Sequence, residues 1–363
     1  MTIERQTRRR TTKTGLTALN VEKACPGYTL YAPMNGPGDV YLLNLAGDEV
    51  HHWKMPDPPG LYGYLLPNGN LFYGGKLRDD TWDRFQSWKR FKGGVMMEVD
   101  WDGNKVWEHR DPDHHHDARR TASGGAVYLT VERVPPDLAA KVKGGNPVTG
   151  ENGMWADVIV EVDASGKRVW EWHAIEHLDP ERDVITFNDS RAEWSHGNTV
   201  SEVSGSRVMF SFRNISTIGM IDKQTGEIVW RLGGEELAQQ HDPSLLPNGN
   251  VLVYDNGSHS AHHPLPFSRV IEVDPASNRI VWEYFDNPAY NFFSPYISGA
   301  RRLANGNTLV TEGMFGRMFQ VTPEGDVVWE YINPYFYEDA ENAVVNRVFR
   351  ATHYLPEEIS WLP

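Results

Sequence analysis

The sequence predicts an all-β fold, a six-bladed β-propeller closed by pairing of its N- and C-terminal segments. Three observations carry this prediction. A hairpin pattern that ends in a tryptophan occurs six times, a tight glycine-containing turn precedes five of the copies, and no segment shows the apolar period of a helix. Because one propeller blade is a four-stranded sheet, two hairpins make a blade and six copies indicate six blades.

The tryptophan-ending hairpin is the clearest repeat. Its tryptophans lie roughly 45 to 65 residues apart, which suits one blade better than a helical repeat. Aromatic residues at a fixed repeat position fill structural space, so we interpret them as core and blade-packing residues. The copies are Val40–Trp53, Val95–Trp107, Val158–Trp170, Ile218–Trp230, Val270–Trp282 and Met318–Trp329.

A second hairpin precedes most copies and supplies the inner half of each blade. Its turns contain Asn-Gly or similar pairs, which tolerate the positive φ angles of a tight hairpin turn. The turns are Asn68–Asn70, Ser123–Gly125, Ser204–Ser206, Asn248–Asn250 and Asn305–Asn307. The hairpin at 40–53 has no such partner, so we expect the C-terminal segment 346–353 to complete its blade and close the ring.

Composition limits the class of protein. The chain has 363 residues and a formal net charge of -14, which argues against a nucleic-acid-binding surface. It has one cysteine, Cys25, so no intramolecular disulfide is required, and no apolar run is long enough to span a bilayer. We predict a basic disordered tail over residues 1–15, a single propeller domain over 16–363, and a soluble cytoplasmic protein.

Histidines recur at one repeat position. The inner strand of a blade runs along the axial channel, so residues about six to eight places before each inner turn should line it. This position holds His116, His196 and His241 in three successive blades, and Leu61 and Ser298 in two others. A single histidine on a strand is more often structural, but three equivalent ones indicate a site on the axis.

The neighbours of these histidines are also polar. Asn198 lies two residues after His196, and Arg213 lies at the end of the next strand. Arginine and asparagine are hydrogen-bond donors, and histidine can carry a proton or act as a nucleophile. The combination predicts a site that holds an anion with several oxygens.

Several motifs resemble the arylsulfate sulfotransferase family, and the resemblance covers nearly the whole chain after about residue 15. The motifs are Trp194–Thr199, Ser211–Asn214, Gln240–Asn250, Asp255–Gly257, the opening Gly27–Leu30 and the Val-Trp-Glu blade endings.

Members of that family are six-bladed propellers that transfer a sulfuryl group from an aryl sulfate to a phenol through a sulfohistidine, without a nucleotide donor. The resemblance implies that His241 is the nucleophile and that His196, Asn198 and Arg213 bind the sulfuryl oxygens. It also implies that His116 assists proton transfer at the phenolic oxygen. We therefore expect a transferase that acts on a small aromatic substrate, without a cofactor.

Two other functions remain open from the residues alone. His116, His196, His241 and His353 could instead bind a transition metal ion, which would make the protein a hydrolase, lyase or oxidoreductase. A non-catalytic propeller that binds a partner at its rim is also compatible with the fold. We expect neither nucleic acid nor membrane as a partner, and homo-oligomer formation stays open.

Overall fold

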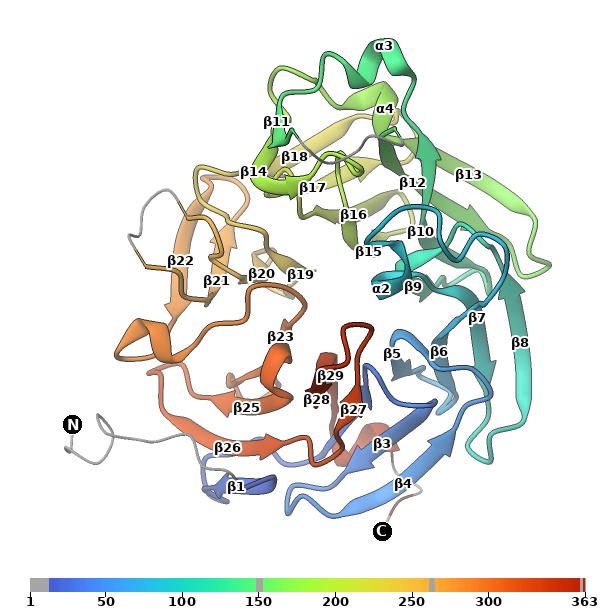
Figure 1. The fold of residues 1–363 in the computed structure, drawn as a ribbon. Coiled ribbons are helices and arrows are strands. Elements are labelled where there is room, and N and C mark those ends of the chain that lie inside the picture. Colours follow the sequence, from blue (N-terminus) through green and yellow to red (C-terminus); the bar gives the residue numbers. More distant parts are fainter. Residues whose placement is uncertain (1–12, 148–152, 261–264, 360–361, 363) are drawn as a thin grey trace.

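The computed structural model describes residues 13–147, 153–260, 265–359 and 362. Their strands form six antiparallel blades arranged in a ring, which confirms the predicted propeller (Figure 1). Most of the predicted basic tail lies outside the described residues, and Gly15 begins a strand. No helix of the described residues is long and apolar enough to cross a membrane.

Each blade has four strands that follow one another from the axis outward. The first three blades are β29 (Val348–Tyr354), β2 (Tyr28–Pro33), β3 (Asp39–Leu43) and β4 (Glu49–Lys54); β5 (Pro59–Leu65), β6 (Leu71–Lys76), β7 (Gly94–Val99) and β8 (Lys105–Arg110); and β9 (His115–Arg120), β10 (Ala126–Arg133), β12 (Trp155–Val162) and β13 (Arg168–His173).

The other three blades continue around the ring. They are β15 (Gly197–Ser204), β16 (Arg207–Phe212), β17 (Thr217–Asp222) and β18 (Ile228–Leu232); β19 (His241–Leu245), β20 (Val251–Asp255), β21 (Arg269–Asp274) and β22 (Arg279–Tyr284); and β23 (Gly299–Arg302), β24 (Thr308–Glu312), β25 (Arg317–Val321) and β26 (Val327–Ile332), with β1 (Gly15–Leu19) as a fifth strand.

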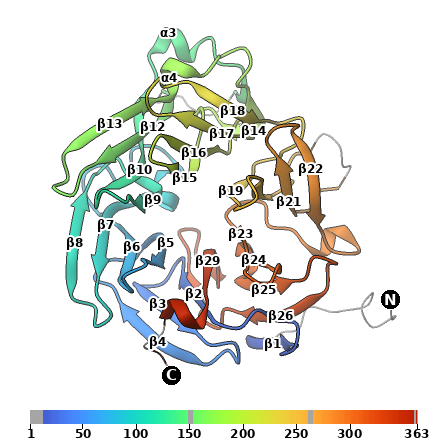
Figure 2. The ribbon, with the colours of Figure 1, turned by 180° about the vertical axis from the view of Figure 1, so that it is seen from behind.

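The first blade closes the ring from both ends of the chain (Figure 2). The prediction that 40–53 and the C-terminal segment share a blade is confirmed, with one correction. The C-terminal segment supplies the innermost strand alone, and the second strand is Tyr28–Pro33, which pairs with it from Tyr28↔Tyr354 to Pro33↔Val348. The reason is length, because residues 346–353 suffice for one strand, whereas the fully buried Tyr28–Pro33 provides the other.

The repeat tryptophans tie neighbouring blades together. The indole N–H of each one donates a hydrogen bond to the next blade around the ring, which is the blade-packing role expected for them. The bonds run from Trp53 to Asp100 O (3.3 Å), Trp107 to Ala164 O (3.0 Å), Trp170 to Lys223 O (3.0 Å), Trp230 to Asn278 Oδ1 (2.8 Å), Trp282 to Pro323 O (2.9 Å) and Trp329 to Leu45 O (2.9 Å).

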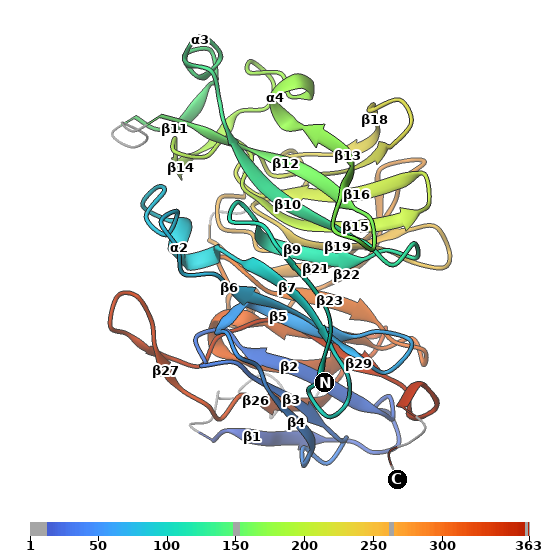
Figure 3. The ribbon, with the colours of Figure 1, turned by 90° about the vertical axis from the view of Figure 1, so that its right-hand side faces the viewer.

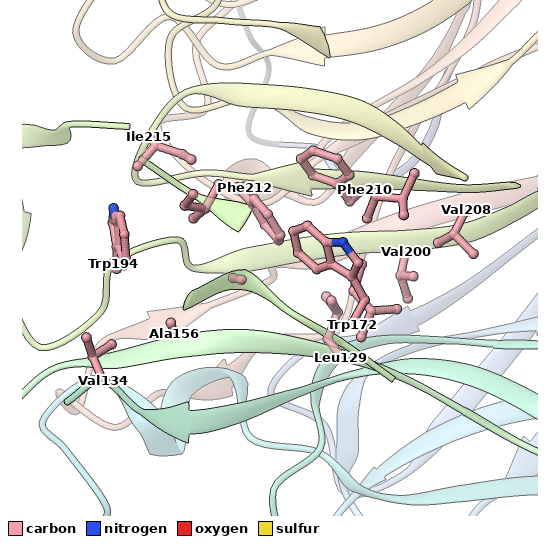
Figure 4. Close-up of a cluster of buried hydrophobic side chains, with 14 of the residues drawn as sticks. Leu129, Val134, Ala156, Trp172, Trp194, Val200, Val208, Phe210, Phe212 and Ile215 are labelled. Atoms are coloured by element: carbon pink, nitrogen blue, oxygen red, sulfur yellow. The ribbon is translucent and has the colours of Figure 1, made fainter. Parts of the chain in front are cut away.

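Apolar side chains fill the space between adjacent blades. Figure 4 shows one such core, in which Leu129 and Trp172 of the third blade pack against Val200, Phe210 and Phe212 of the fourth. Full burial of such side chains stabilises the fold by about 1.5–3 kcal/mol each. The six blades are therefore rigidly placed around the axis.

Most of the additional segments gather on one face of the ring (Figure 3). These are α2 (Trp88–Phe91), the parallel pair β11 (Gly144–Asn146) and β14 (Ile185–Ser190), and the hairpin β27 (Tyr337–Glu338) and β28 (Val344–Val345). The other short helices are α3 (Pro136–Ala139), α4 (Ala174–His177) and three 3-10 turns at Ala289–Asn291, Gly313–Phe315 and Pro356–Ile359.

Candidate active site

A cavity of about 620 Å³ lies where the blades converge. Every blade contributes to it, and the segments on the decorated face, from Ser87–Phe91, Asn188–Ser190 and Glu338–Glu341, form part of its wall. The residues that line it from the six inner strands, or from just before them, include in blade order Phe349, Leu61, His116, His196, His241 and Ile297. The three histidines that share one repeat position therefore line the same cavity.

Backbone geometry places these side chains. His116 and His196 have φ angles of 50° and 51°. In the next two blades Asp242, directly after His241, has 59°, and Ile297 and Ser298 have 55° and 91°. The left-handed region costs roughly 1–2 kcal/mol for a residue with a Cβ. Such strain gathers at functional sites, where the surrounding structure holds it in place.

His241 is held in one tautomer. Asn256 donates its amide hydrogens to the carbonyl oxygens of Ser294 (2.7 Å) and Ile297 (3.0 Å), so its Oδ1 faces His241 as an acceptor. His241 Nδ1–H therefore donates to that oxygen at 2.7 Å, and Nε2 carries the lone pair, which accepts the Ile297 N–H at 3.2 Å. Burial lowers the pKa of His241 well below its usual 6.5, and Arg213 lowers it further. The ring is a neutral potential nucleophile.

His116 and His196 pack against each other beside Phe91. Their ring centroids lie 4.8 Å apart, and the Phe91 ring stacks on His116 at 4.4 Å. His196 Nδ1 lies 2.9 Å from Glu193 Oε1, so it donates to that carboxylate. Burial lowers the pKa of His116 well below 6.5, and the neighbouring His196 adds to the effect. The two rings present separate imidazole groups to the cavity.

Arg213 also lines the cavity, as the prediction requires. Its Nη1 donates to Asp189 Oδ1 at 2.9 Å and to Asn214 Oδ1 at 3.2 Å. Asp189 comes from β14, one of the segments on the decorated face. The guanidinium is thus fixed in place by a carboxylate while remaining at the cavity wall.

Asn198 and Ser298 lie elsewhere. Asn198 is fully buried, its Nδ2 donates to Gln240 O at 2.8 Å, and its Oδ1 accepts from Thr199 Oγ1 at 3.1 Å. Neither Asn198 nor Ser298 lines the cavity. The amide of Asn198 instead joins the inner edges of the fourth and fifth blades.

An ionic layer occupies the axis next to the histidines. Arg350 is fully buried and contacts Asp117 Oδ2 at 3.0 Å and Asp242 Oδ1 at 3.4 Å. Asp242 also binds both Nη atoms of Arg301, at 2.5 and 2.6 Å, and Asp117 lies 3.4 Å from Arg119. Burial alone would raise the pKa of Asp117, but Arg119 and Arg350 hold it below its usual value. These two aspartates pair with the arginines of this layer and do not line the cavity.

The four histidines proposed for a metal site do not come together. His353 Nε2 donates to Pro26 O at 3.1 Å on the closing strand, and His353 does not line the cavity. Among the described residues no group of three or more His, Cys, Asp or Glu side chains is arranged to hold a metal ion.

Sequence reasoning missed the residues that orient the histidines. Asn256 belongs to the Asp255–Gly257 motif, but its role depends on a contact between the end of β20 and the next blade. The one hint in the sequence was Glu193, which lies three residues before His196 and contacts its ring. Phe91 and Phe349, which flank the histidine rings, come from a loop insertion and from the closing strand, and they carry no repeat signal.

The buried neutral histidines make stability depend on pH. Burial lowers the pKa of His114 to about 3 and those of His116 and His241 well below 6.5, whereas each titrates near 6.5 once unfolded. The unfolded chain therefore binds more protons below about pH 6.5. As the pH falls further, the free energy of unfolding decreases by about 1.4 kcal/mol per pH unit for each such histidine. Urea unfolding between about pH 7.5 and 5 should show this loss.

His114 offers a matched variant for that measurement. It is 2% exposed, and its Nδ1 accepts the Gly94 N–H at 2.8 Å, which a glutamine oxygen can also accept. His114→Gln should remove the contribution of one histidine to the pH dependence of the free energy of unfolding below about pH 6.5. An unfolding midpoint that does not change over this range would contradict the neutral, buried state of these rings.

Comparison with known proteins agrees with the fold. Among solved structures, a protein of unknown function from Bacteroides caccae is 13% identical with a TM-score of 0.55, covering 90% of this chain and 98% of that chain. The WD40 β-propeller domain of Doa1 (10% identity, TM-score 0.47, coverage 95% and 93%) and streptogramin B lyase (11%, 0.47, 94% and 93%) are also similar. At these identities the first likeness concerns the fold alone. No curated protein matches the chain.

The model of the arylsulfotransferase (ASST) family matches residues 86–334. That range runs from the second blade to the sixth and contains His116, His196, Arg213 and His241. The chain therefore belongs to the arylsulfotransferase family.

Proposed function

We propose that the protein transfers a sulfuryl group from an aryl sulfate to a phenolic acceptor through a covalent intermediate on His241. The observation that carries the proposal is the tautomer of His241. Asn256 holds Nδ1–H, so the Nε2 lone pair belongs to a neutral ring at the cavity wall. A neutral imidazole is a competent nucleophile once its lone pair leaves the Ile297 N–H.

The reaction divides into two half-reactions. In the first, His241 Nε2 forms a bond to sulfur while the bond from sulfur to the aryl oxygen breaks and a phenolate leaves. In the second, the acceptor phenol loses its proton to a base, its oxygen attacks sulfur, and the electron pair returns to Nε2. His116 is proposed as the base, because its ring lines the same cavity.

Donors near His241 would stabilise the sulfuryl oxygens. Arg213 supplies a fixed guanidinium, and the Ile297 N–H is released from Nε2 once that atom bonds to sulfur. His196, whose Nδ1–H is held by Glu193, lines the same cavity. These donors suit the charge that a sulfuryl group carries.

The wall of the cavity suits an aromatic anion. Phe91, Phe349, Trp82 and Tyr296 provide aromatic surface for an aryl group. Lys76 also lines the cavity, and its Nζ donates to the carbonyl oxygens of Lys89 and Arg90 at 3.1 Å each rather than to a carboxylate. Burial lowers the pKa of Lys76 to about 8. The cavity wall holds six Lys and Arg side chains against five carboxylates, so it is less acidic than a chain of net charge -14 is as a whole.

The wild-type protein should form a measurable adduct. Mixing it with nitrophenyl sulfate in the absence of acceptor should release a burst of about one equivalent of nitrophenol and add one sulfuryl group to the intact mass. Peptide mapping should place the group on His241, and adding a phenol should remove it. Prior dialysis against a chelator should change nothing, because the proposal requires no cofactor. Steady release of phenol without any adduct would sink the proposal.

A further inference from the structure

Behind His116 lies a line of buried polar groups that the proposed two-step transfer leaves unused. His115 Nδ1 lies 2.8 Å from His116 Nδ1, and His115 Nε2 lies 3.1 Å from Asp157 Oδ1. His115 and Asp157 are each 1% exposed, and His116 is 6% exposed. The line therefore runs from the interior of the third blade to the cavity.

The acceptors at the inner end fix where the protons are. His115 Nε2 faces two acceptors, Asp157 Oδ1 and, at 3.3 Å, Thr130 O, so it must carry a hydrogen. A neutral His115 then has its lone pair on Nδ1, which can only accept. His116 Nδ1 must be the donor across the 2.8 Å contact, and the lone pair of a neutral His116 is on Nε2.

The carboxylate at the end of the line is itself held firmly. Gly197 N–H lies 2.8 Å from both oxygens of Asp157, and Ser195 Oγ donates to Oδ2. Burial alone would raise the pKa of Asp157, but the hydrogen bonds from His115, Ser195 and the Gly197 N–H hold it below its usual value. Trp88 and Phe91 pack at 5.8 and 5.9 Å from the His115 ring and cover it. A charged anchor thus orients two imidazoles in sequence.

We propose that Asp157 and His115 are positioning residues that make His116 the general base toward the acceptor phenol and the general acid toward the departing phenolate. This inference rests on the proposed sulfuryl transfer. The acceptor's O–H proton moves to His116 Nε2 as the phenol oxygen bonds to sulfur. The donor half-reaction is the chemical reverse. His116 Nε2 carries a proton, taken from solvent in the first turnover and from the previous acceptor in later ones, and gives it to the leaving oxygen while the bond from sulfur to that oxygen breaks, so that a phenol departs.

The line of hydrogen bonds also stabilises a positive charge on the His116 ring. His196, His241 and Arg350 face His116 from other blades, and burial together with these groups opposes a positive charge on its ring. When His116 gains a proton, its Nδ1–H bond to His115 and the His115 bond to Asp157 both strengthen toward the carboxylate. Asp157 thereby offsets the charge that forms during each transfer, without becoming protonated itself.

The test uses Asp157→Asn. The amide keeps an acceptor for the Gly197 N–H but turns a hydrogen toward His115 Nε2. Only Thr130 O, at 3.3 Å, then remains as an acceptor for that nitrogen, so we expect His115 to become an Nδ1–H donor. His116 Nδ1 must then accept, and its hydrogen moves to Nε2, where the lone pair was. Nitrogen-15 NMR of the histidine rings should show both tautomers reversed, and turnover of phenyl sulfate should fall about 10²–10⁴-fold.

The leaving group separates this role from a merely structural one. Nitrophenolate leaves without much protonation, whereas unsubstituted phenolate needs it, so Asp157→Asn should slow phenyl sulfate more than nitrophenyl sulfate. Ser195→Ala removes another hydrogen bond to the same carboxylate and serves as the control, since it should leave both tautomers in place. An equal loss with both esters would overturn the proposal.

The wild-type protein provides a reading that does not depend on any variant folding. Its spectrum should show Nε2–H on His115 and Nδ1–H on His116, and the opposite assignment contradicts the proposal. The His241 adduct is measured independently. An adduct together with the wrong tautomers would reject the role of Asp157 and His115 alone, whereas correct tautomers without any adduct would reject the sulfuryl transfer.

Discussion

Replacing His241 by alanine is expected to abolish the sulfuryl adduct and lower turnover of nitrophenyl sulfate by at least about 10⁴-fold. The substitution removes the only atom that the proposal bonds to sulfur, but leaves Arg213 and the aromatic wall in place. Binding of the ester should therefore change little while kcat collapses. Free imidazole should restore part of the turnover, because it can enter the vacated space and donate its N–H to Asn256 Oδ1. Stopped-flow release of nitrophenol and intact mass measure both effects.

His353→Ala is the matched histidine control. His353 lies on the closing strand, hydrogen-bonded to Pro26 O, and it does not line the cavity. If the proposed mechanism holds, this variant should form the adduct at the wild-type rate. Adduct formation in His241→Ala, or an equal loss of activity in His353→Ala, would contradict the assignment of the nucleophile.

The positions of the three axial histidines could be predicted because a hairpin turn fixes the phase of the strand before it. Equal offsets from equivalent turns reach the same level of the axis in each blade, which is where His116, His196 and His241 meet. Closure could be predicted in outline for a similar reason, since the hairpin at 40–53 required a partner. The strand Tyr28–Pro33 was overlooked, because it belongs to neither repeated hairpin.

The residues that orient the site could not be predicted in the same way. Asn256, Asp157 and Arg350 act across strand and blade boundaries, where sequence distance says nothing about contact. Asn198 is the opposite case, since it shares a motif with His196 but its amide donates to Gln240 O. A motif identifies which residues are close in sequence, whereas hydrogen-bond direction decides which of them reach the cavity.

Arg350→Met should lower the free energy of unfolding by about 3–5 kcal/mol. Arg350 is fully buried on the strand that closes the ring, between Asp117 and Asp242. Methionine fills much of the same space but leaves two buried carboxylates without this shared cation. Lys143→Met provides the contrast, because Lys143 and Glu181 are 55% and 70% exposed and such a pair contributes under about 1 kcal/mol. Denaturant unfolding of both variants measures the difference.

A second substitution identifies the source of the loss. If Arg350→Met destabilises because it leaves Asp117 charged and poorly paired, then adding Asp117→Asn should recover part of the stability, since the amide needs no counter-ion. The new amide oxygen would still accept the Val200 N–H, which lies 3.1 Å from Asp117 Oδ2. If the double variant is instead destabilised by the sum of the two single changes, the cost lies in lost packing around Arg350. The ionic layer would then hold the closing strand through contact area rather than charge.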